Sequence, residues 1–239
     1  MRKLEVVMSP ALLPYYKVAG KSVVVIDILR ATSSMCVAFK NGVEKILPVS
    51  SPEECRIFKD FDFVIAAEKD AIKVDGFDLG NSPFDFDNYL LDGKSVAMAT
   101  TNGTKALKYA QEHGAKNIVI GSFLNLTQVC NWIKSVDEDI ILLCAGWKDK
   151  VNLEDTLFAG AICDNLQHDL TIDCDSALSA KLLYQANKDN LEDLVRMSSH
   201  AKRFQLLHLQ TDDIKYCLQI DFAPVLPILK GVYLVNNAK

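Results

Sequence analysis

Short, nearly continuous hydrophobic runs recur along the first 150 residues of the chain. The apolar positions in most of these runs do not alternate with polar ones, a pattern that predicts strands covered on both faces. The predicted strands are 4–9, 22–27, 45–50, 63–68, 95–100, 117–122 and 139–146.

Segments with helix start and stop signals separate these runs. Ser51 and Pro52 followed by two acids are typical of a helix start, and Gly42 and Gly114 stand where a left-handed C-cap residue is favoured. Strand and helix therefore alternate from about residue 20 to residue 167. This alternation predicts an α/β fold, with a mainly parallel sheet and helices on both faces in a three-layer α/β/α arrangement.

After Asp169 the pattern changes to a helical C-terminal part. We expect helices over 175–187, 190–207 and 211–219, then a last strand at 231–235. Since no linker composition interrupts the chain, we expect a single domain over residues 1–239. A weak similarity between 24–34 and 95–104 allows two similar subdomains, with a boundary that the sequence does not fix.

The composition is that of an ordinary globular protein: 239 residues, 49% hydrophobic and 24% charged, with a formal net charge of -5. The acidic balance argues against nucleic acid and anionic membranes as partners. The seven cysteines include no C-x-x-C pair, so they indicate neither a disulfide framework nor a zinc ribbon. No run approaches the roughly 18 apolar residues of a membrane span, so we expect a cytoplasmic protein. A homo-oligomer is compatible with the sequence.

Polar residues gather where the predicted strands end. In a parallel sheet, ligands bind beyond the carboxyl ends of the strands, so these residues should converge on a single edge. The strand ends carry Asp27 with Arg30 and Thr32, Glu68 with Lys69, Thr100 to Thr104, Ser122 with Asn125, and 144–146.

The segment Asp27 to Ser34 leads directly from a strand into a helix. A carboxylate at Asp27 can bind a metal or act as a nucleophile, and Arg30 offers a planar fork for phosphate or carboxylate. Thr32 and Ser33 add hydroxyls and backbone amides at a helix start, which favours an anion. The alternative is a structural turn, with Asp27 satisfied by loop amides and Thr32 as an N-cap.

A second polar turn, "TTNGT", covers Thr100 to Thr104. Gly103 would let the backbone approach an anion while Thr101, Asn102 and Thr104 donate hydrogen bonds, as in a phosphate cradle. A capped strand-to-helix turn explains the same residues equally well. The segment lacks the lysine of a nucleoside-triphosphate loop.

Two further segments carry candidates with structural alternatives. Asn81 and Ser82, in the glycine-containing loop 76–86, can line a site or serve turn chemistry. Glu154 and Asp155, in the first turn of a predicted helix, can contact a metal or simply complement the helix dipole.

Several hydrolase signatures are absent from the sequence. The four histidines form no H-E-x-x-H motif, and no G-x-S-x-G elbow is present. Cys144 at a strand end could be a nucleophile, but a small buried residue is the commoner explanation.

Six motifs in order along the chain resemble the 2-phosphosulfolactate phosphatase family. They are "VVVIDILRATSS", "GFDLGNSP", "ATTNGTKAL", "GSFLN", "CAGW" and "NLEDTLFAG". The resemblance covers about residues 20 to 165 and continues more weakly through "SSHAKRF" and "DDIKYC" to near 220. It implies an α/β phosphatase that depends on Mg²⁺ and acts on phosphate esters of 2-hydroxy carboxylic acids, with 2-phosphosulfolactate as the named substrate.

The resemblance also assigns site residues by motif. These are Asp27, Arg30, Thr32, Asn81, Ser82, Thr101, Asn102, Gly103, Thr104, Asn125, Gly146 and Asp155. One departure is "AAEKD" at 66–70, where the family usually has Gly-Glu-Arg. Lys69 keeps the charge but lacks the bidentate fork, so recognition of the substrate's second anion is expected to differ.

Mg²⁺ prefers oxygen ligands, so the expected metal ligands are Asp27, Glu68, Glu154 and Asp155. Asp27 is either the nucleophile or the principal Mg²⁺ ligand, with Arg30 and the amides of 100–104 holding the phosphoryl group. Glu68 or Asp155 would protonate the leaving oxygen. Two alternatives stay open: a non-catalytic phospho-acid or phosphosugar binding protein, and a thiol hydrolase built on Cys144.

Overall fold

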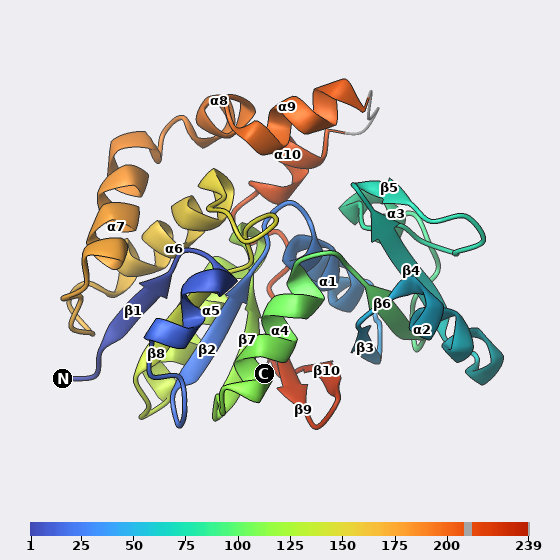
Figure 1. Ribbon diagram of the computed structural model, residues 1–239, viewed down its shortest axis with the longest axis horizontal. Coiled ribbons are helices and arrows are strands. Elements are labelled where there is room, and N and C mark those ends of the chain that lie inside the picture. Colours follow the sequence, from blue (N-terminus) through green and yellow to red (C-terminus); the bar gives the residue numbers. More distant parts are fainter. Residues whose placement is uncertain (208–211, 239) are drawn as a thin grey trace.

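The computed structural model describes residues 1–207 and 212–238, which form one mixed ten-stranded sheet with helices packed against it (Figure 1). The strands are β1 (Leu4–Val7), β2 (Ser22–Ile26), β3 (Lys45–Val49), β4 (Val64–Lys69), β5 (Ile72–Lys73), β6 (Ser95–Ala99), β7 (Asn117–Gly121), β8 (Ile140–Cys144), β9 (Pro227–Lys230) and β10 (Tyr233–Asn236). Each of the eight strands that the hydrophobic pattern predicts is present.

The sheet contains two groups of parallel strands in the order β1-β8-β2-β7-β9-β10-β3-β6-β4-β5. Strands β1, β8, β2 and β7 are parallel to one another, as are β3, β6 and β4. The antiparallel hairpin β9–β10 lies between the groups and joins each by one bridge pair, Val119 with Ile228 and Leu234 with Ile46. The mainly parallel α/β fold is confirmed, while the division into two similar subdomains stays a prediction.

The helices alternate with the strands up to β8 and then follow one another. They are α1 (Ala31–Lys40), α2 (Pro52–Ile57), α3 (Pro83–Asp87), α4 (Gly103–Glu112), α5 (Leu126–Ser135), α6 (Leu153–Leu166), α7 (Asp175–Asn187), α8 (Leu191–Arg196), α9 (Ser199–Leu206) and α10 (Asp213–Cys217). The predicted helix 190–207 is divided into α8 and α9, because the Ser198 hydroxyl accepts a hydrogen bond from the Ala201 amide and starts a new helix. Thr211, the first residue of the last predicted helix, lies outside the described residues, as does His208.

Strand β2 shows why both faces of the sheet are covered. Val24 and Ile26 belong to one apolar cluster, with residues of α5 and α6 such as Phe158. Val23 and Val25 belong to the opposite cluster, which includes residues of α1 and α4. Successive side chains of a strand point to opposite faces, so a continuous hydrophobic run is what two helical layers require.

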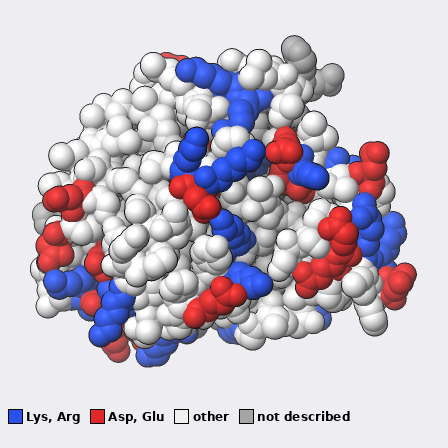
Figure 2. Space-filling model, viewed as in Figure 1, with Lys and Arg blue, Asp and Glu red and all other residues white. Residues whose placement is uncertain are grey.

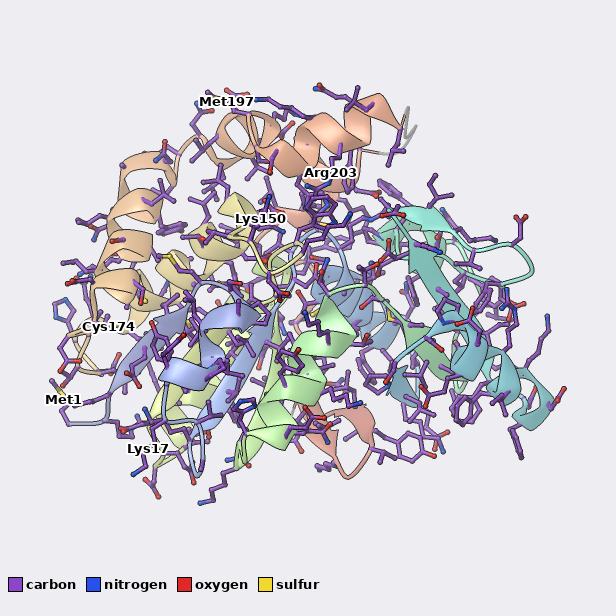
Figure 3. The ribbon with its side chains drawn as sticks, in the orientation of Figure 1. Met1, Lys17, Lys150, Cys174, Met197 and Arg203 are labelled. Carbon is purple, nitrogen blue, oxygen red and sulfur yellow. The ribbon has the colours of Figure 1, made fainter. Side chains whose placement is uncertain are left out.

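The C-terminal helices place side chains over the sheet. Helices α8 and α9 lie beyond the carboxyl ends of the central strands (Figure 1). Figure 3 shows Arg203 of α9 above the loop that carries Lys150. On the face shown in Figure 2, basic and acidic side chains are intermixed. Among the helices of the described part of the chain, none has the length and apolar character needed to cross a membrane.

Candidate active site

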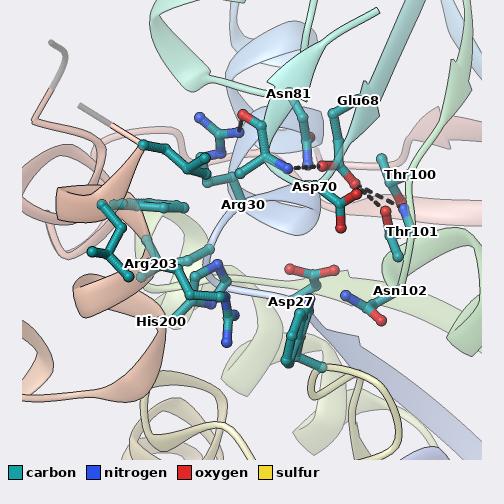
Figure 4. Close-up of a pocket in the computed structure, with 16 residues that line it drawn as sticks. Asp27, Arg30, Glu68, Asp70, Asn81, Thr100, Thr101, Asn102, His200 and Arg203 are labelled. Atoms are coloured by element: carbon teal, nitrogen blue, oxygen red, sulfur yellow. Dashed lines mark hydrogen bonds between the residues drawn. The ribbon is translucent and has the colours of Figure 1, made fainter. Parts of the chain in front are cut away.

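A cavity of about 230 Å³ opens where β2, β4, β6 and β8 end, beneath α9 (Figure 4). Figure 4 shows Asp27 near its centre, with Thr100, Thr101 and Asn102 on one side and His200 and Arg203 on the other. The lining residues are Asp27, Leu29, Arg30, Glu68, Asp70, Ala71, Asn81, Thr100, Thr101, Asn102, Trp147, His200, Arg203, Phe204, Leu206 and Leu207. The expected convergence of strand ends therefore holds for β2, β4 and β6.

Asp27 is a buried acid, 6% exposed, that directly follows β2. Burial raises the pKa of its carboxyl from 3.8 to about 7, against the opposing effect of the Ala31 amide, and the charges of Glu68 and Glu154 raise it further. The Ala31 amide donates to Asp27 Oδ1 over a long 3.4 Å. One long amide contact does not satisfy a buried carboxylate, and this favours a functional acid over the structural alternative.

Thr32 and Ser33 hold the turn after Asp27 and do not line the cavity. The Thr32 hydroxyl accepts from the Asp27 amide at 3.0 Å and donates to the Asp27 carbonyl at 2.9 Å. The Ser33 hydroxyl donates to the Ile28 carbonyl at 2.8 Å and lies 2.9 Å from the Ser122 hydroxyl. The structure therefore corrects the expected ligand-binding role of both side chains to positioning of Asp27.

Arg30 lines the cavity, but its guanidinium is already engaged. Its Nη1 lies 2.5 Å from Asp213 Oδ2, its Nη2 donates to the Ala71 carbonyl at 2.7 Å, and its plane lies over Phe204. Ser82, predicted at the site, donates to Asp213 Oδ1 at 2.7 Å and lies outside the lining. Asp213 thus anchors Arg30 and Ser82 together, and Arg30 is not a free anion fork.

Glu68 and Thr101 form a connected pair at the cavity rim. Glu68 Oε1 accepts from the Thr101 amide at 3.0 Å and from its hydroxyl at 2.6 Å, while Oε2 accepts from the Ala71 amide at 2.7 Å. Asn81 is different, because its buried side-chain oxygen Oδ1 has no hydrogen-bond partner within the described structure. An orphaned buried acceptor in a cavity indicates a ligand that donates to it or binds it as a metal.

The "TTNGT" turn places the first turn of α4 against Asp27. A Cβ added to Gly103 would lie 2.6 Å from the Ala31 Cβ and 3.1 Å from Asp27 Oδ2. Only glycine permits this approach, as expected for a cradle. Thr104 is committed to Thr100, whose hydroxyl accepts its amide at 3.1 Å and whose carbonyl accepts its hydroxyl at 2.7 Å. Thr100, Thr101 and Asn102 thus line the cavity, whereas Thr104 supports the turn.

Asn125 and Asp155 lie away from the cavity, contrary to expectation. Asn125 accepts from the Ser122 amide and donates to two backbone carbonyls, so it caps a turn. Asp155 accepts from the Ile28 amide at 2.9 Å and the Gly146 amide at 3.0 Å, and so ties the ends of β2 and β8 together. Burial raises the pKa of Asp155 well above its ordinary value, with the charges of Glu154 and Asp27 adding to the effect.

Three residues that line the cavity were not predicted from the sequence to be site residues: Trp147, His200 and Arg203. His200 Nδ1 lies 2.7 Å from Oε1 of the fully buried Glu154, whose Oε2 has no hydrogen-bond partner among the described residues. Glu154 itself does not line the cavity, so it contacts the cavity through His200. Arg203 lies over the Trp147 ring, 3.8 Å from its centroid. The signal available in the sequence was the weak "SSHAKRF" motif, since His200 and Arg203 are three residues apart on one helix face.

The four expected metal ligands do not form one cluster. Across residues 1–207 and 212–238, no group of three or more His, Cys, Asp or Glu side chains is arranged to hold a metal. Of the four, Asp27 and Glu68 line the cavity, and Glu154 and Asp155 have structural partners. Two carboxylates and the orphaned Asn81 oxygen are hard oxygen donors, which fits Mg²⁺ bound with substrate phosphate and water.

The fold and the cavity define a class: an α/β protein in which a buried acid and the N-terminal end of a helix meet at one cavity, an arrangement that suits phosphoryl transfer. The family model described as 2-phosphosulpholactate phosphatase matches residues 7–231. The chain belongs to this family, which confirms the expectation of a phosphatase, a phosphoric monoester hydrolase.

Individual relatives agree with the family model. A probable 2-phosphosulfolactate phosphatase of Caldanaerobacter subterraneus subsp. tengcongensis is 38% identical over 216 residues, 88% of each chain. Relatives of the same name from Thermotoga maritima and Clostridium novyi are 37% and 34% identical, and cover 98% and 94% of this chain and 99% and 96% of their own.

Proposed function

We propose that this protein is a Mg²⁺-dependent phosphatase that hydrolyses phosphate monoesters of 2-hydroxy carboxylic acids, with 2-phosphosulfolactate converted to sulfolactate and phosphate. The observation that carries the proposal is the close approach of the buried Asp27 carboxyl to the first turn of α4, where a Cβ added to Gly103 would lie 3.1 Å from Asp27 Oδ2. The names of the relatives supply the substrate.

The phosphoryl group would lie between Asp27 and the "TTNGT" turn. The first amides of α4 have no partner within the helix and point to its N-terminal end, where partial positive charge favours an anion. Asn102, the N-cap residue, makes no capping hydrogen bond with its side chain, which leaves its amide available for a phosphate oxygen. Asp27 either accepts the phosphoryl group as the nucleophile or holds the metal next to it.

Asp27, Glu68 and Asn81 are the residues that would hold Mg²⁺. When bound, the ion supplies positive charge that offsets the repulsion between the cavity carboxylates and the phosphate. Its presence is supported by the charge balance, because Asp27, Glu68 and Asp70 line the same cavity.

His200 is the group best placed to protonate the leaving oxygen. The Glu154 carboxylate binds Nδ1 and so fixes the ring, which leaves Nε2 for the cavity. In hydrolysis the ester P–O bond breaks, the proton passes from His200 to the leaving alkoxide, and water supplies the hydroxyl that completes inorganic phosphate while its other proton returns to His200. Glu68 and Asp155, the residues predicted from sequence, are both committed to backbone amides.

Phosphate release from a panel of 2-phospho-hydroxy acids, with Mg²⁺ and with EDTA, tests this function. Release is expected with Mg²⁺, and loss of release is expected with EDTA or in Asp27→Asn. Near-normal activity of Asp27→Asn would exclude both roles of Asp27. Tight binding of the esters without Mg²⁺ and without release would favour the non-catalytic binding protein. Phosphoaspartate detected by mass spectrometry after acid quench would assign Asp27 as the nucleophile.

The remaining expectations belong to the same proposal. The seven cysteines are all free, which supports a reducing compartment and hence the cytoplasm. A single domain, a possible homo-oligomer and the absence of nucleic-acid partners also stay predictions.

A further inference from the structure

We propose that Arg203, held flat against Trp147, binds the carboxylate of the substrate's acid moiety while the phosphate lies at Asp27 and the start of α4. This inference rests on the proposed function and assigns a subsite within the same cavity. It makes Arg203 a specificity-determining residue that was not among the site residues predicted from the sequence.

The first support is that Arg203 carries an unsatisfied donor. Its Nη2 is buried and has no hydrogen-bond partner within the described part of the chain, and none of the ion pairs found there includes Arg203. Burial lowers the pKa of its guanidinium, and the charge of Glu154 opposes this effect without forming an ion pair with Arg203. Glu154 binds His200 through Oε1, and its Oε2 has no hydrogen-bond partner among the described residues. Arg203 as a whole is only half-buried, but a buried Nη2 donor without a partner, on a guanidinium that forms no ion pair among the described residues, indicates an anionic ligand.

The second support comes from the other cations near the cavity. Arg30 is paired with the buried Asp213, so it adds little net positive charge. Lys69, which stands where the family usually has an arginine, is exposed and does not line the cavity. Lys105 forms an ion pair with Asp149. Of the two arginines that line the cavity, Arg203 is thus the one left for a second substrate anion.

The third support is the orientation of the guanidinium. The Arg203 guanidinium carbon lies 3.8 Å from the centroid of the Trp147 ring, which covers one face of the group. The edge of the group carries its N–H donors, and these match the two oxygens of a carboxylate as a bidentate fork. Figure 4 shows Asp27 near the centre of the cavity and Arg203 at one side of it, apart from each other as a ligand with two separate anions requires.

The experiment compares two phosphate esters that differ in the carboxylate. We would measure kcat/KM with Mg²⁺ for 2-phosphoglycolate, which has a carboxylate, and for ethyl phosphate, which has none. The ratio of the two values is expected to fall about 10- to 100-fold in Arg203→Gln, because a bidentate charge-assisted contact is lost. Arg203→Lys keeps the charge without the fork and should lose less.

Arg196→Gln is the matched control. Arg196 lies on the preceding helix and is satisfied by Glu192 and Asp212, so its replacement should leave the ratio at the wild-type value. If Arg203→Gln does not fold, as judged by circular dichroism, Arg203→Lys decides, and a wild-type ratio in that variant overturns the inference.

A third ester, the phosphate of 2-hydroxyethanesulfonate, separates the two acid groups of the proposed substrate. If Arg203→Gln lowers kcat/KM for this ester but leaves the ratio of 2-phosphoglycolate to ethyl phosphate unchanged, Arg203 binds the sulfonate and the inference is wrong. If the wild-type protein releases phosphate neither from the three esters nor from 2-phosphosulfolactate, the proposed function is wrong. This outcome differs from a failure of the subsite alone, in which the wild-type protein is active but the ratio does not change in Arg203→Gln.

Discussion

Nδ1 of His200 lies 2.7 Å from Oε1 of Glu154, although 46 residues separate the two in the chain. Both side chains are buried, and the His200 ring packs edge-on against Phe204 with 4.8 Å between the ring centroids. A carboxylate on one ring nitrogen fixes the tautomer and the direction of the other. The pair therefore holds the His200 ring in one orientation at the cavity, as the acid role proposed for it requires.

Replacement of His200 tests its role as the acid. His200→Gln should lower kcat for an alkyl phosphate about 10²- to 10⁴-fold, since an alkoxide needs a proton to leave. The loss should be much smaller for p-nitrophenyl phosphate, whose leaving group is stable without one. His113→Gln, at the C-cap of α4, is the control, because the His113 ring contacts Tyr109 and does not line the cavity. Equal losses for both esters would contradict the assignment.

The buried carboxyl of Asp27 predicts a pH-dependent stability in the metal-free protein. Its folded-state pKa of about 7 exceeds the ordinary 3.8, so the folded state binds the proton more tightly. The resulting stabilisation is complete below about pH 4 and is lost as the pH rises towards 7. Asp27→Asn removes this titration, so the variant does not lose this stabilisation as the pH rises. Between about pH 4 and pH 7, the free energy of unfolding of wild type should therefore fall by up to about 4 kcal/mol relative to that of Asp27→Asn.

Urea unfolding in EDTA at pH 4.5 and pH 7.5 measures this difference. Asp75→Asn is the control, because Asp75 is exposed and lies outside the cavity. A difference between wild type and Asp27→Asn that does not change with pH would show that the Asp27 carboxyl does not titrate in this range.

Gly103→Ala should damage the cradle directly. The new Cβ would meet the Ala31 Cβ at 2.6 Å, so α1 and α4 must separate. We expect a loss of about 1–3 kcal/mol in stability together with a rise in KM, because the first turn of α4 moves away from Asp27.

Gly76→Ala provides the comparison, measured by urea unfolding and phosphate release. Gly76 has a φ of +79° but no atom within 4 Å of the added Cβ, so alanine there costs about 1 kcal/mol of backbone strain without contact at the cavity. A similar loss of activity in both variants would argue that the effect is general instability.

Cys144 should be dispensable for activity. The thiol is fully buried, and burial raises its pKa well above the ordinary 9.0, so it stays neutral and unreactive. Cys144→Ala is expected to keep kcat, at a stability cost of about 1 kcal/mol. Iodoacetamide at pH 8 should modify the partly exposed Cys174 first. Inactivation by Cys144→Ala would instead support the thiol hydrolase.

Some site residues could be identified from the sequence because one local segment determines their place. Asp27 and the "TTNGT" turn follow buried strands, and a strand that leads into a helix fixes where the next few residues lie. The same reasoning also predicted ligand-binding roles for Thr32, Ser33 and Asn125, which do not line the cavity. Hydroxyl and amide side chains cap turns as readily as they bind ligands, and only the structure shows that their hydrogen bonds are already used.

The fold, like the site, was predicted from the sequence only in part. Continuous hydrophobic runs determined the strands and their double coverage, because burial on both faces leaves no polar positions. The β9–β10 hairpin and its antiparallel junctions depend on contacts between strands such as β7 and β9, which are more than 100 residues apart. Local sequence carries no record of such pairings.

By itself, the sequence determined a mainly parallel α/β fold and the acid at the end of β2, since both follow from the order of hydrophobic and polar residues along a short stretch. Only the tertiary structure decided which charges are free. Arg30 is neutralised by Asp213, whereas Arg203 retains a buried donor without a partner in the described structure. The physical reason is that the availability of a charge depends on its neighbours in space, and these neighbours come from remote parts of the chain.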